Sequence, residues 1–139
     1  IEADPYYLTD GLGTDFVLGG LNMRTRDYAR FGLLYANNGY LNGRQIVPAD
    51  WVAQSTTNSA PEAAPVVLDY DATLGYGFQW WLHPEATEGE FFALGIYGQM
   101  IYVNRPLKTV IAVNQADLKF RENLERNLTV MRKIAQTLA

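Results

Sequence analysis

The hydrophobic pattern divides this 139-residue sequence into a helical first part, a middle part without a period, and a strand-rich last part. Behind Thr25 the apolar side chains recur every three or four residues, which predicts an amphipathic helix. Thr25 is the expected N-cap, and Asn38 with the following glycine supplies the stop. A shorter helix is predicted behind Pro48, which suits a first helical turn, with Trp51 and Val52 as its apolar anchors.

Two stretches show neither helical nor strand periodicity. Residues 1–20 contain several turn-forming Asp, Gly and Pro positions and are expected to be irregular. Their aromatic and aliphatic side chains argue against a free tail. Residues 57–73 are rich in Thr, Ala and Pro, which predicts a surface loop. A loop of this length suggests a binding role or mobility.

The last part of the chain predicts an antiparallel sheet followed by a helix. Four runs rich in aromatic and β-branched residues are typical of strands, namely 74–82, 90–96, 99–104 and 109–114. The connections between them are short, which favours an antiparallel meander over helical crossovers. Residues 120–138 then repeat apolar side chains at helical spacing, with charged residues opposite, so this helix should cover one face of the sheet.

The predicted fold class is therefore α+β in one domain spanning residues 1–139. Residues 1–56 form its loop and helical part, 57–73 the loop, and 74–139 the sheet with the C-terminal helix packed on one face. The chain opens on Ile1 without a starting methionine and without a signal sequence. This suggests a fragment, a mature product or an excised domain.

Composition excludes several classes of function. A net charge of −4 with scattered basic residues argues against nucleic acid as the main partner. No apolar run is long enough for a membrane span. The absence of cysteine excludes disulfides, thiolate zinc sites and cysteine nucleophiles, but leaves the compartment open. A 48% hydrophobic content, with 13% aromatic residues, suffices for a core.

The chain lacks the common nucleophile–base pairs. A Ser-x-x-Lys pair would place a hydroxyl one helical turn from an amine, but the positions three residues before the three lysines hold Arg105, Ala116 and Val130. Its single histidine, His83, stands in an expected hairpin loop and is interpreted as a solvated surface residue. No metal site is predicted. Three Tyr-x-Asn triplets, at Tyr35, Tyr40 and Tyr102, are interpreted as structural.

The residues 95–99, Gly-Ile-Tyr-Gly-Gln, stand between two apolar strand-like runs. Two glycines in such a place let a ligand or another backbone approach closely. They also suit a tight hairpin in which glycine supplies a positive φ, and the residues alone favour this second interpretation.

An ordered series of motifs resembles the class C β-lactamase-like hydrolases. Residues 19–32 are similar to that family's GG-(L/F)-x-(S/T)-x-x-D-(L/Y)-A-R-F-G stretch, and further similar segments follow in order at 38–47, 51–52, 75–81 and 95–99. The resemblance runs from about residue 4 to the C-terminus. The subgroup that the chain most resembles contains the 6-aminohexanoate-dimer hydrolase, alongside family VIII esterases and D-alanyl-D-alanine-cleaving peptidases.

The resemblance implies a partial β-lactamase/transpeptidase-like fold and acyl-enzyme chemistry. In this family a Ser is acylated by an ester or amide, a Lys and a Tyr carry protons, and two backbone N–H groups form the oxyanion hole. The Ser, Lys and Tyr lie upstream of the matched region. No catalytic residue is therefore expected in this chain, which alone should be inactive, and no cofactor is implied.

The resemblance also selects candidate substrate-binding residues. The family's Lys-Thr-Gly motif is carried over onto Tyr97, Gly98 and Gln99, where no cation stands at Tyr97, so β-lactam hydrolysis is put in doubt. A neutral, aromatic-lined site suits an amide or ester better. The strand around Ile96–Met100 should still offer a backbone N–H that contributes to the oxyanion hole. Asn22 is carried over as a pocket residue, or else bonds local backbone.

A tryptophan pair supplies the last candidate. Trp80 and Trp81 are expected on opposite faces of a strand, one in the core and the other at the acyl pocket. The pattern does not decide between them, and Trp81 is taken as the candidate pocket residue.

The leading hypothesis is the C-terminal portion of a serine hydrolase that acts on a small-molecule amide or ester. The alternative is a non-catalytic β-lactamase-like module that binds peptide, peptidoglycan or a protein partner. The family sheet is completed by upstream strands, so an open edge and exposed apolar surface are expected here. We therefore expect this chain to self-associate, or to dock with the missing N-terminal part of the same domain. The bacterial compartment, periplasm or cytoplasm, stays undecided.

Overall fold

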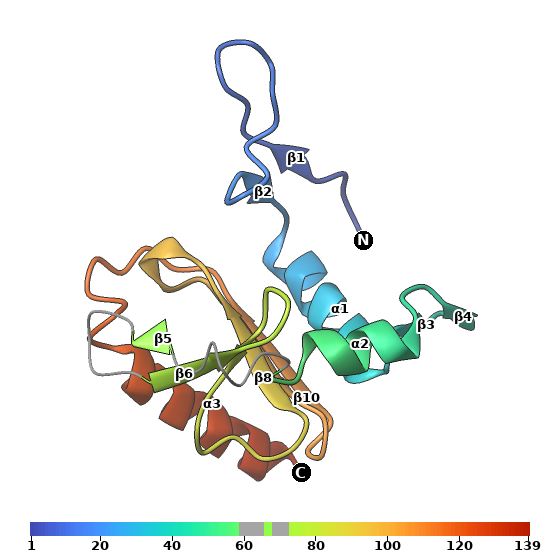
Figure 1. The fold of residues 1–139 in the computed structure, drawn as a ribbon, viewed down its shortest axis with the longest axis vertical. Helices are drawn as coiled ribbons and strands as arrows, with labels where there is room; N and C mark the ends of the chain where they lie inside the picture. The colour runs from blue at the N-terminus through green and yellow to red at the C-terminus, as the bar shows by residue number, and fades with distance from the viewer. Residues whose placement is uncertain (59–65, 68–72) are drawn as a thin grey trace.

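The computed structural model describes residues 1–58, 66–67 and 73–139, which form a sheet with helices on both faces (Figure 1). The sheet has six antiparallel strands in the order β10-β9-β8-β7-β6-β5. Their bounds are Val66–Val67 (β5), Thr73–Tyr76 (β6), Trp81–Leu82 (β7), Glu90–Leu94 (β8), Met100–Asn104 (β9) and Thr109–Val113 (β10). The helices are Thr25–Ala36 (α1), Ala49–Ser55 (α2) and Leu124–Leu138 (α3). The predicted α+β class and the antiparallel meander are confirmed.

The centre of the sheet is buried on both faces because β9 alternates its side chains between two apolar layers. Met100 and Tyr102 pack with Phe92 against α3, while Ile101 and Val103 pack on the opposite side with the first two helices. All five residues of β9 are buried. The strand therefore reads as a continuous apolar run, as expected for a sheet covered on both sides.

Gly32 lets α1 approach the sheet closely. A Cβ atom at this position would lie 2.6 Å from Val110 Cγ1 and 2.7 Å from Ile101 Cγ2, both of which belong to sheet strands. Such distances are shorter than side-chain contacts allow, so only glycine fits.

The predicted single strand over 74–82 is wrong: it is two short strands, β6 and β7, joined by a turn. The turn forms because the backbone at Gly77 packs on the end of α2. A Cβ at Gly77 would lie 2.1 Å from the carbonyl oxygen of Ser55, and that carbonyl accepts a 3.0 Å hydrogen bond from the Phe78 amide. Gln79 completes the turn with a φ of 69°.

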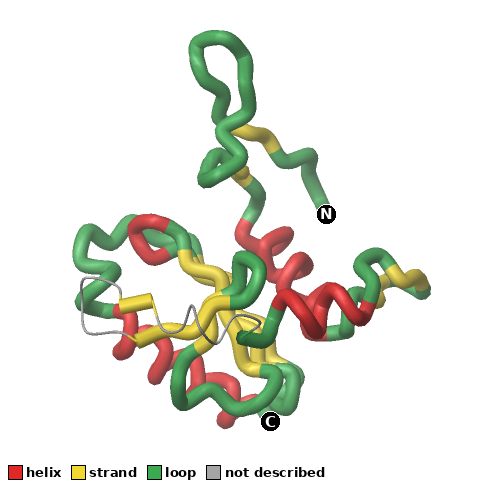
Figure 2. The backbone as a smooth tube through the Cα atoms, in the orientation of Figure 1, coloured by secondary structure: helices red, strands yellow, loops and turns green. Residues whose placement is uncertain are grey.

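An N-terminal arm, residues 1–22, projects from the body of the molecule (Figure 1). It was expected to be irregular, but Tyr6–Tyr7 (β1) pairs with Leu21–Asn22 (β2) as a two-stranded sheet. The arm is tied to α1 at its base. The Glu2 amide donates a 2.8 Å hydrogen bond to Asp27, and the Glu2 carboxylate pairs with Arg30. Figure 2 shows that the rest of the arm is loop.

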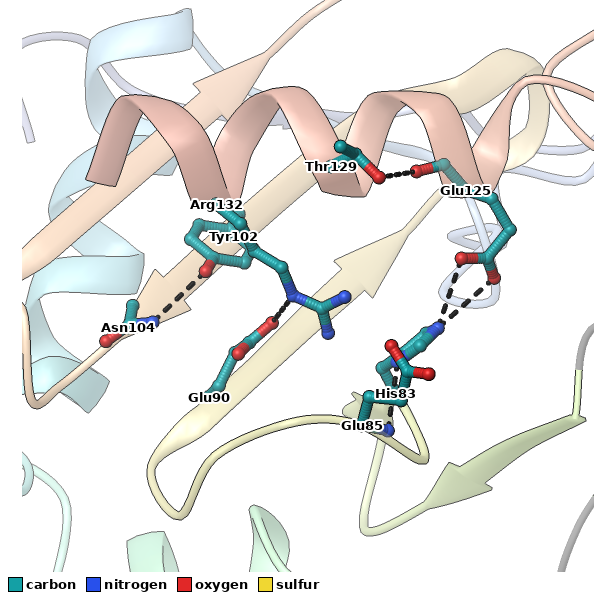
Figure 3. A network of polar contacts seen from close by, with 8 residues as sticks. All are labelled: His83, Glu85, Glu90, Tyr102, Asn104, Glu125, Thr129 and Arg132. Atoms are coloured by element: carbon teal, nitrogen blue, oxygen red, sulfur yellow. Dashed lines mark hydrogen bonds and ion pairs between the residues drawn. The ribbon is translucent and has the colours of Figure 1, made fainter. Parts of the chain in front are cut away.

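Two polar contacts fix α3 to the sheet side of the molecule (Figure 3). Arg132 Nε donates a 2.7 Å hydrogen bond to the buried carboxylate of Glu90 in β8. His83 Nε2 lies 3.1 Å from a carboxylate oxygen of Glu125. The interpretation of His83 as a solvated surface residue is therefore wrong, since its side chain is only 9% exposed and faces a helix that is distant in sequence.

The predicted element boundaries shift in three places. Thr25 is not the N-cap but the first residue of α1, and its hydroxyl accepts a hydrogen bond from Asn114 instead. The last helix begins at Leu124 rather than at residue 120, because the preceding residues form turns. Of the predicted loop 57–73, residues 59–65 and 68–72 lie outside the described residues, and 66–67 form β5. In addition, Tyr40–Leu41 (β3) and Arg44–Gln45 (β4) pair as a tight hairpin.

Replacement of Gly32 by alanine should destabilise the protein. The added Cβ must displace two sheet side chains, which costs about 1–3 kcal/mol net of the better helix propensity of alanine. Urea unfolding should show a lower midpoint. Gly11→Ala is the matched control, because a Cβ there meets nothing within 4 Å, and it should stay within about 0.5 kcal/mol of the parent. Equal effects of the two variants would contradict the close-packing argument.

The attachment of the arm should weaken in acid. Burial alone would raise the pKa of Asp27, but the hydrogen bonds from Arg30 and from the Glu2 amide outweigh it and hold the pKa below 3.8. A depressed folded-state pKa stabilises the fold above the unfolded value, and this contribution is lost as pH falls through the folded value. The stability advantage of the parent over Asp27→Asn should therefore shrink between about pH 6 and about pH 3.

Urea unfolding at several pH values measures this advantage. Asp50→Asn, at an exposed position on α2, serves as the control for a general loss of carboxylate charge. An advantage over Asp27→Asn that stays constant from neutral to acidic pH would show that the Asp27 carboxylate does not carry the effect.

Candidate functional site

A groove of about 760 Å³ opens between the base of the arm, the β6–β7 turn region and the junction of β8 with β9. Its apolar lining comes from all three segments, with Phe16, Leu18, Leu21, Met23, Tyr28, Tyr76, Trp81, Leu94, Ile96, Met100, Ile101 and Val113. Apart from the phenol groups of Tyr28 and Tyr76, the polar side chains that the described residues bring to it are carboxamides, from Asn22, Gln79, Gln99, Asn114 and Gln115. The groove is therefore an apolar surface with neutral polar groups.

The structure brings four of the six predicted site residues to this groove. Asn22, Trp81, Ile96 and Gln99 all line it, although they come from three separate parts of the chain. Tyr97 and Gly98 do not line it. The ring of Tyr97 faces Phe120 edge-on with centroids 6.3 Å apart, and Gly98 is buried behind the wall.

The tryptophan pair divides as its spacing required. Trp80 is 3% exposed and packs in the core, with its ring 4.7 Å from that of Tyr35 and 4.9 Å from that of Phe91. Trp81 is half-buried, lies in β7 and lines the groove next to Tyr76, with the two ring centroids 4.5 Å apart. This edge-to-face pair forms an aromatic platform in the groove.

The corner formed by residues 95–99 joins β8 to β9 through a single 3-10 turn over Ile96–Gly98. Tyr97 has a φ of 68° and Gly98 a φ of 85°. Hydrogen bonds of 2.8 Å from the Gly95 amide to Gln99 O, and of 3.0 Å from the Gly98 amide to Gly95 O, close the turn. The tight-hairpin interpretation is confirmed, and the same hairpin forms one wall of the groove. A non-glycine residue in the left-handed region is uncommon, so this corner stores local strain.

Residues that follow β10 hold the corner in place. Gln115 Nε2 donates a 2.8 Å hydrogen bond to Gly98 O, and the Asp117 amide donates a 3.0 Å hydrogen bond to Tyr97 O. A Cβ at Gly98 would lie 2.3 Å from Gln115 Nε2, so the contact depends on glycine. The first N–H groups of a helical turn lack partners inside it, and no described residue accepts a hydrogen bond from the amide of Ile96 or Tyr97.

Asn22 reaches the groove from the base of the arm. Its Nδ2 donates a 2.8 Å hydrogen bond to Gly20 O, so the interpretation as a loop Asn that bonds local backbone also holds. The Tyr28 hydroxyl donates a 2.7 Å hydrogen bond to Leu21 O and fixes the neighbouring backbone. Both contacts orient Asn22 while it lines the groove.

The phenol groups in the groove are neutral. Burial raises the pKa of the Tyr28 hydroxyl and of the Tyr76 hydroxyl above their ordinary value. Neither phenol can therefore serve as a resident anion near neutral pH. The part of the chain that the structure describes brings no ionised side chain to the groove wall.

Within residues 1–58, 66–67 and 73–139, no serine, lysine or histidine lines the groove. Ser55, the serine within the described residues, is fully buried and its hydroxyl donates to Val52 O, while Ser59 lies outside them. The described residues contain no cluster of three or more metal-binding side chains. Across the same part of the chain, no helix combines the length and hydropathy that a bilayer crossing requires.

Sequence reasoning missed several residues of this site. Tyr28, Tyr76 and Asn114 stand in elements that were predicted, and Gln115 directly follows one, but none of their side chains was assigned to a groove. The alternation of β6 and β7 across the turn would have placed Tyr76 beside Trp81, had the break at Gly77 been found. Asn114 and Gln115 carry no such signal, because their approach to the site depends on the path of the chain after β10.

The family profile described as Beta-lactamase matches residues 2–136, which is nearly the whole chain. This chain belongs to the β-lactamase family. The 6-aminohexanoate-dimer hydrolase of Paenarthrobacter ureafaciens is 27% identical over 115 residues, covering 79% of this chain and 28% of that protein. A solved Bacillus anthracis protein, provisionally named 6-aminohexanoate-dimer hydrolase, superposes with a TM-score of 0.76 at 31% identity, over 96% of this chain and 34% of that one.

The resemblance to β-lactamase-like hydrolases is therefore confirmed for fold and family. The chain spans about a third of the length of the relatives that it matches. The β-lactamase family relationship covers the arm, the helices and the sheet together, so the groove lies inside the matched region.

Proposed function

We propose that this chain is the C-terminal portion of a serine hydrolase that cleaves an amide or ester through an acyl-enzyme. The observation that carries the proposal is the groove, whose wall includes Gly95, Ile96 and Gln99 of the corner but, among the described residues, no nucleophile. A wall with a shaped apolar surface and a free main-chain donor suits a reacting group that is brought opposite it. The Ser, Lys and Tyr of the chemistry would come from polypeptide outside these residues.

The chemistry divides between the two parts. A serine hydroxyl attacks the substrate carbonyl, its proton passes to a base, and the carbonyl oxygen becomes an oxyanion. The amide N–H of Ile96, a residue that lines the groove and whose amide has no acceptor among the described residues, would contribute to stabilising that oxyanion. The amine or alcohol then leaves with a proton, and water hydrolyses the acyl-enzyme to release the acid and restore the serine.

A neutral substrate fits this wall better than a β-lactam. A carboxylate on the substrate requires a cation beside it, because an unpaired buried charge is costly. Tyr97 stands where the family has a lysine, and its ring turns toward Phe120 rather than into the groove. The names of the two relatives refer to an amide, the dimer of 6-aminohexanoate, which favours an amide within the proposed substrate class.

The alternative function is a non-catalytic module that binds peptide, peptidoglycan or a protein partner. The observation that favours it is the departure from the family's cationic motif at Tyr97, since a module without catalysis need not hold the motif. The same groove would then bind its ligand without an acyl-enzyme. The presence of Ser-x-x-Lys in the parent polypeptide distinguishes the two functions.

The exposed surfaces support a partner for this chain, either upstream polypeptide of the same domain or a second copy. β10 ends the sheet and has a neighbour on one side only within the described residues. The arm exposes apolar side chains, with Leu12 at 93%, Leu18 at 86% and Val17 at 75%. Isolated soluble monomers rarely expose an unpaired strand edge together with apolar surface of this kind.

The 139-residue chain alone should not hydrolyse nitrophenyl esters, whereas the full-length protein should. Spectrophotometric release of nitrophenol measures both. A full-length variant with the Ser of Ser-x-x-Lys replaced by alanine is the control, and it should lose activity by about a thousandfold or more. Flat traces from a folded full-length protein would contradict the hydrolase and favour the binding module.

The isolated chain should also self-associate in solution. Light scattering should give a mass above 15.6 kDa, the mass of one chain, and a hydrophobic dye should bind the apolar arm. Replacement of Leu12 and Leu18 by serine should reduce both signals. A clean monomer that binds no dye would contradict the proposed need for a partner.

A further inference from the structure

The groove wall carries an unusual set of polar groups. Among the residues that the structure describes, five primary carboxamides line it, and no Asp, Glu, Lys, Arg or His side chain does. A carboxamide both donates and accepts hydrogen bonds but carries no charge. Such a surface suits a ligand group that is itself neutral and able to hydrogen-bond, and it offers nothing to balance an ion.

The five carboxamides are not equivalent. Those of Asn22, Asn114 and Gln115 donate to other atoms of the protein and are occupied in building the site. The carboxamides of Gln79 and Gln99 have no hydrogen-bond partner among the described residues. Gln79 is exposed on its turn, whereas Gln99 is half-buried. A half-buried carboxamide without a partner gains most from a ligand, because it is already partly removed from water.

The place of Gln99 depends on a glycine. A Cβ at Gly95 would lie 2.9 Å from Gln99 Oε1 and 3.4 Å from Gln99 Cβ, so a larger residue at position 95 would displace the side chain. Gly95 and Gln99 are also the two ends of the closed turn, joined by the 2.8 Å backbone hydrogen bond. The carboxamide therefore lies against Gly95, where the corner begins, and it lines the same groove as Ile96.

The aromatic platform defines the other part of this surface. The rings of Tyr76 and Trp81 meet edge to face, and burial keeps the Tyr76 hydroxyl protonated by raising its pKa. A platform of this kind packs well on a flat or aliphatic neutral segment. Together, the platform and Gln99 suit a ligand that has a short apolar segment and ends in a neutral hydrogen-bonding group.

We infer that Gln99 is a specificity-determining residue, which selects substrates whose acyl part ends in an uncharged amide and discriminates against the corresponding carboxylate. The inference rests on the proposed hydrolase function. A terminal amide would exchange hydrogen bonds with the Gln99 carboxamide. A carboxylate would accept one hydrogen bond at most from that side chain and would lose its water without a cation in return.

A pair of nearly isosteric substrates tests the inference on the full-length enzyme. The nitrophenyl ester of 4-carbamoylbutanoic acid ends in an amide, and the nitrophenyl monoester of glutaric acid ends in a carboxylate. The parent enzyme should prefer the amide by about tenfold or more in kcat/KM. Gln99→Lys should reverse or abolish the preference, and Gln99→Glu should lower turnover of the carboxylate ester further.

Nitrophenyl butanoate, which has no terminal polar group, reports the basal activity. Gln136→Lys, at an exposed position on α3 away from the groove, is the matched control for added charge and should keep the parent preference. Thermal unfolding of each variant confirms that it is folded. If Gln99→Lys does not fold, the Gln99→Glu ratio decides.

The outcomes separate the two claims. If butanoate ester turnover is normal but the parent treats the amide and carboxylate esters alike, the inference on Gln99 is overturned while the hydrolase stands. The same holds if both Gln99 variants keep the parent ratio. If the folded parent hydrolyses no ester, the proposed function itself fails and the inference falls with it.

Discussion

The structure depends on the burial of β9 between two apolar layers. Its odd and even side chains pack on opposite sides, against α3 and against α1 with α2, so the strand cannot slip by one residue without exchanging both layers. The approach of α1 at Gly32 locks one side, and the buried Glu90–Arg132 ion pair ties the other side to α3. The register of β9 in turn fixes the position of its first residue, Met100, and therefore the position of the 95–99 corner that precedes it.

The corner converts this packing into a site. Its turn is held by hydrogen bonds from Gln115 and Asp117, while the amides of Ile96 and Tyr97 donate to no acceptor among the described residues. The carbonyl groups of Tyr97 and Gly98 thus accept hydrogen bonds from the chain after β10, whereas the amide donors of the turn stay free. This division is the pattern expected of a preorganised main-chain site, and in a β-lactamase family member it suits an oxyanion. The Gln99 carboxamide at the end of the same corner is likewise without a hydrogen-bond partner among the described residues, and in our proposal it would bind the substrate.

Prediction from the sequence worked where one local pattern decides the structure. The helix ending near Asn38, the strands around 90–94, 100–104 and 109–113, and their antiparallel order follow from periodicity and short connections. It did not work where a distant contact decides. The break between β6 and β7 comes from Gly77 packing on Ser55, and His83 is shielded because Glu125 lies over it. Thr25 lost its cap role because the preceding residue already adopts the cap conformation.

The candidate site shows the same division. The sequence by itself determined the family, the fold class, the absence of charge at Tyr97 and four residues that line one groove, because motifs and residue chemistry are properties of the chain order. Only the tertiary structure decided that Trp81 rather than Trp80 faces the groove, that Tyr97 turns away from it, and that the Gln99 carboxamide is left without a partner. These depend on which surfaces meet after packing, and residues far apart in sequence meet there for reasons that no local pattern records.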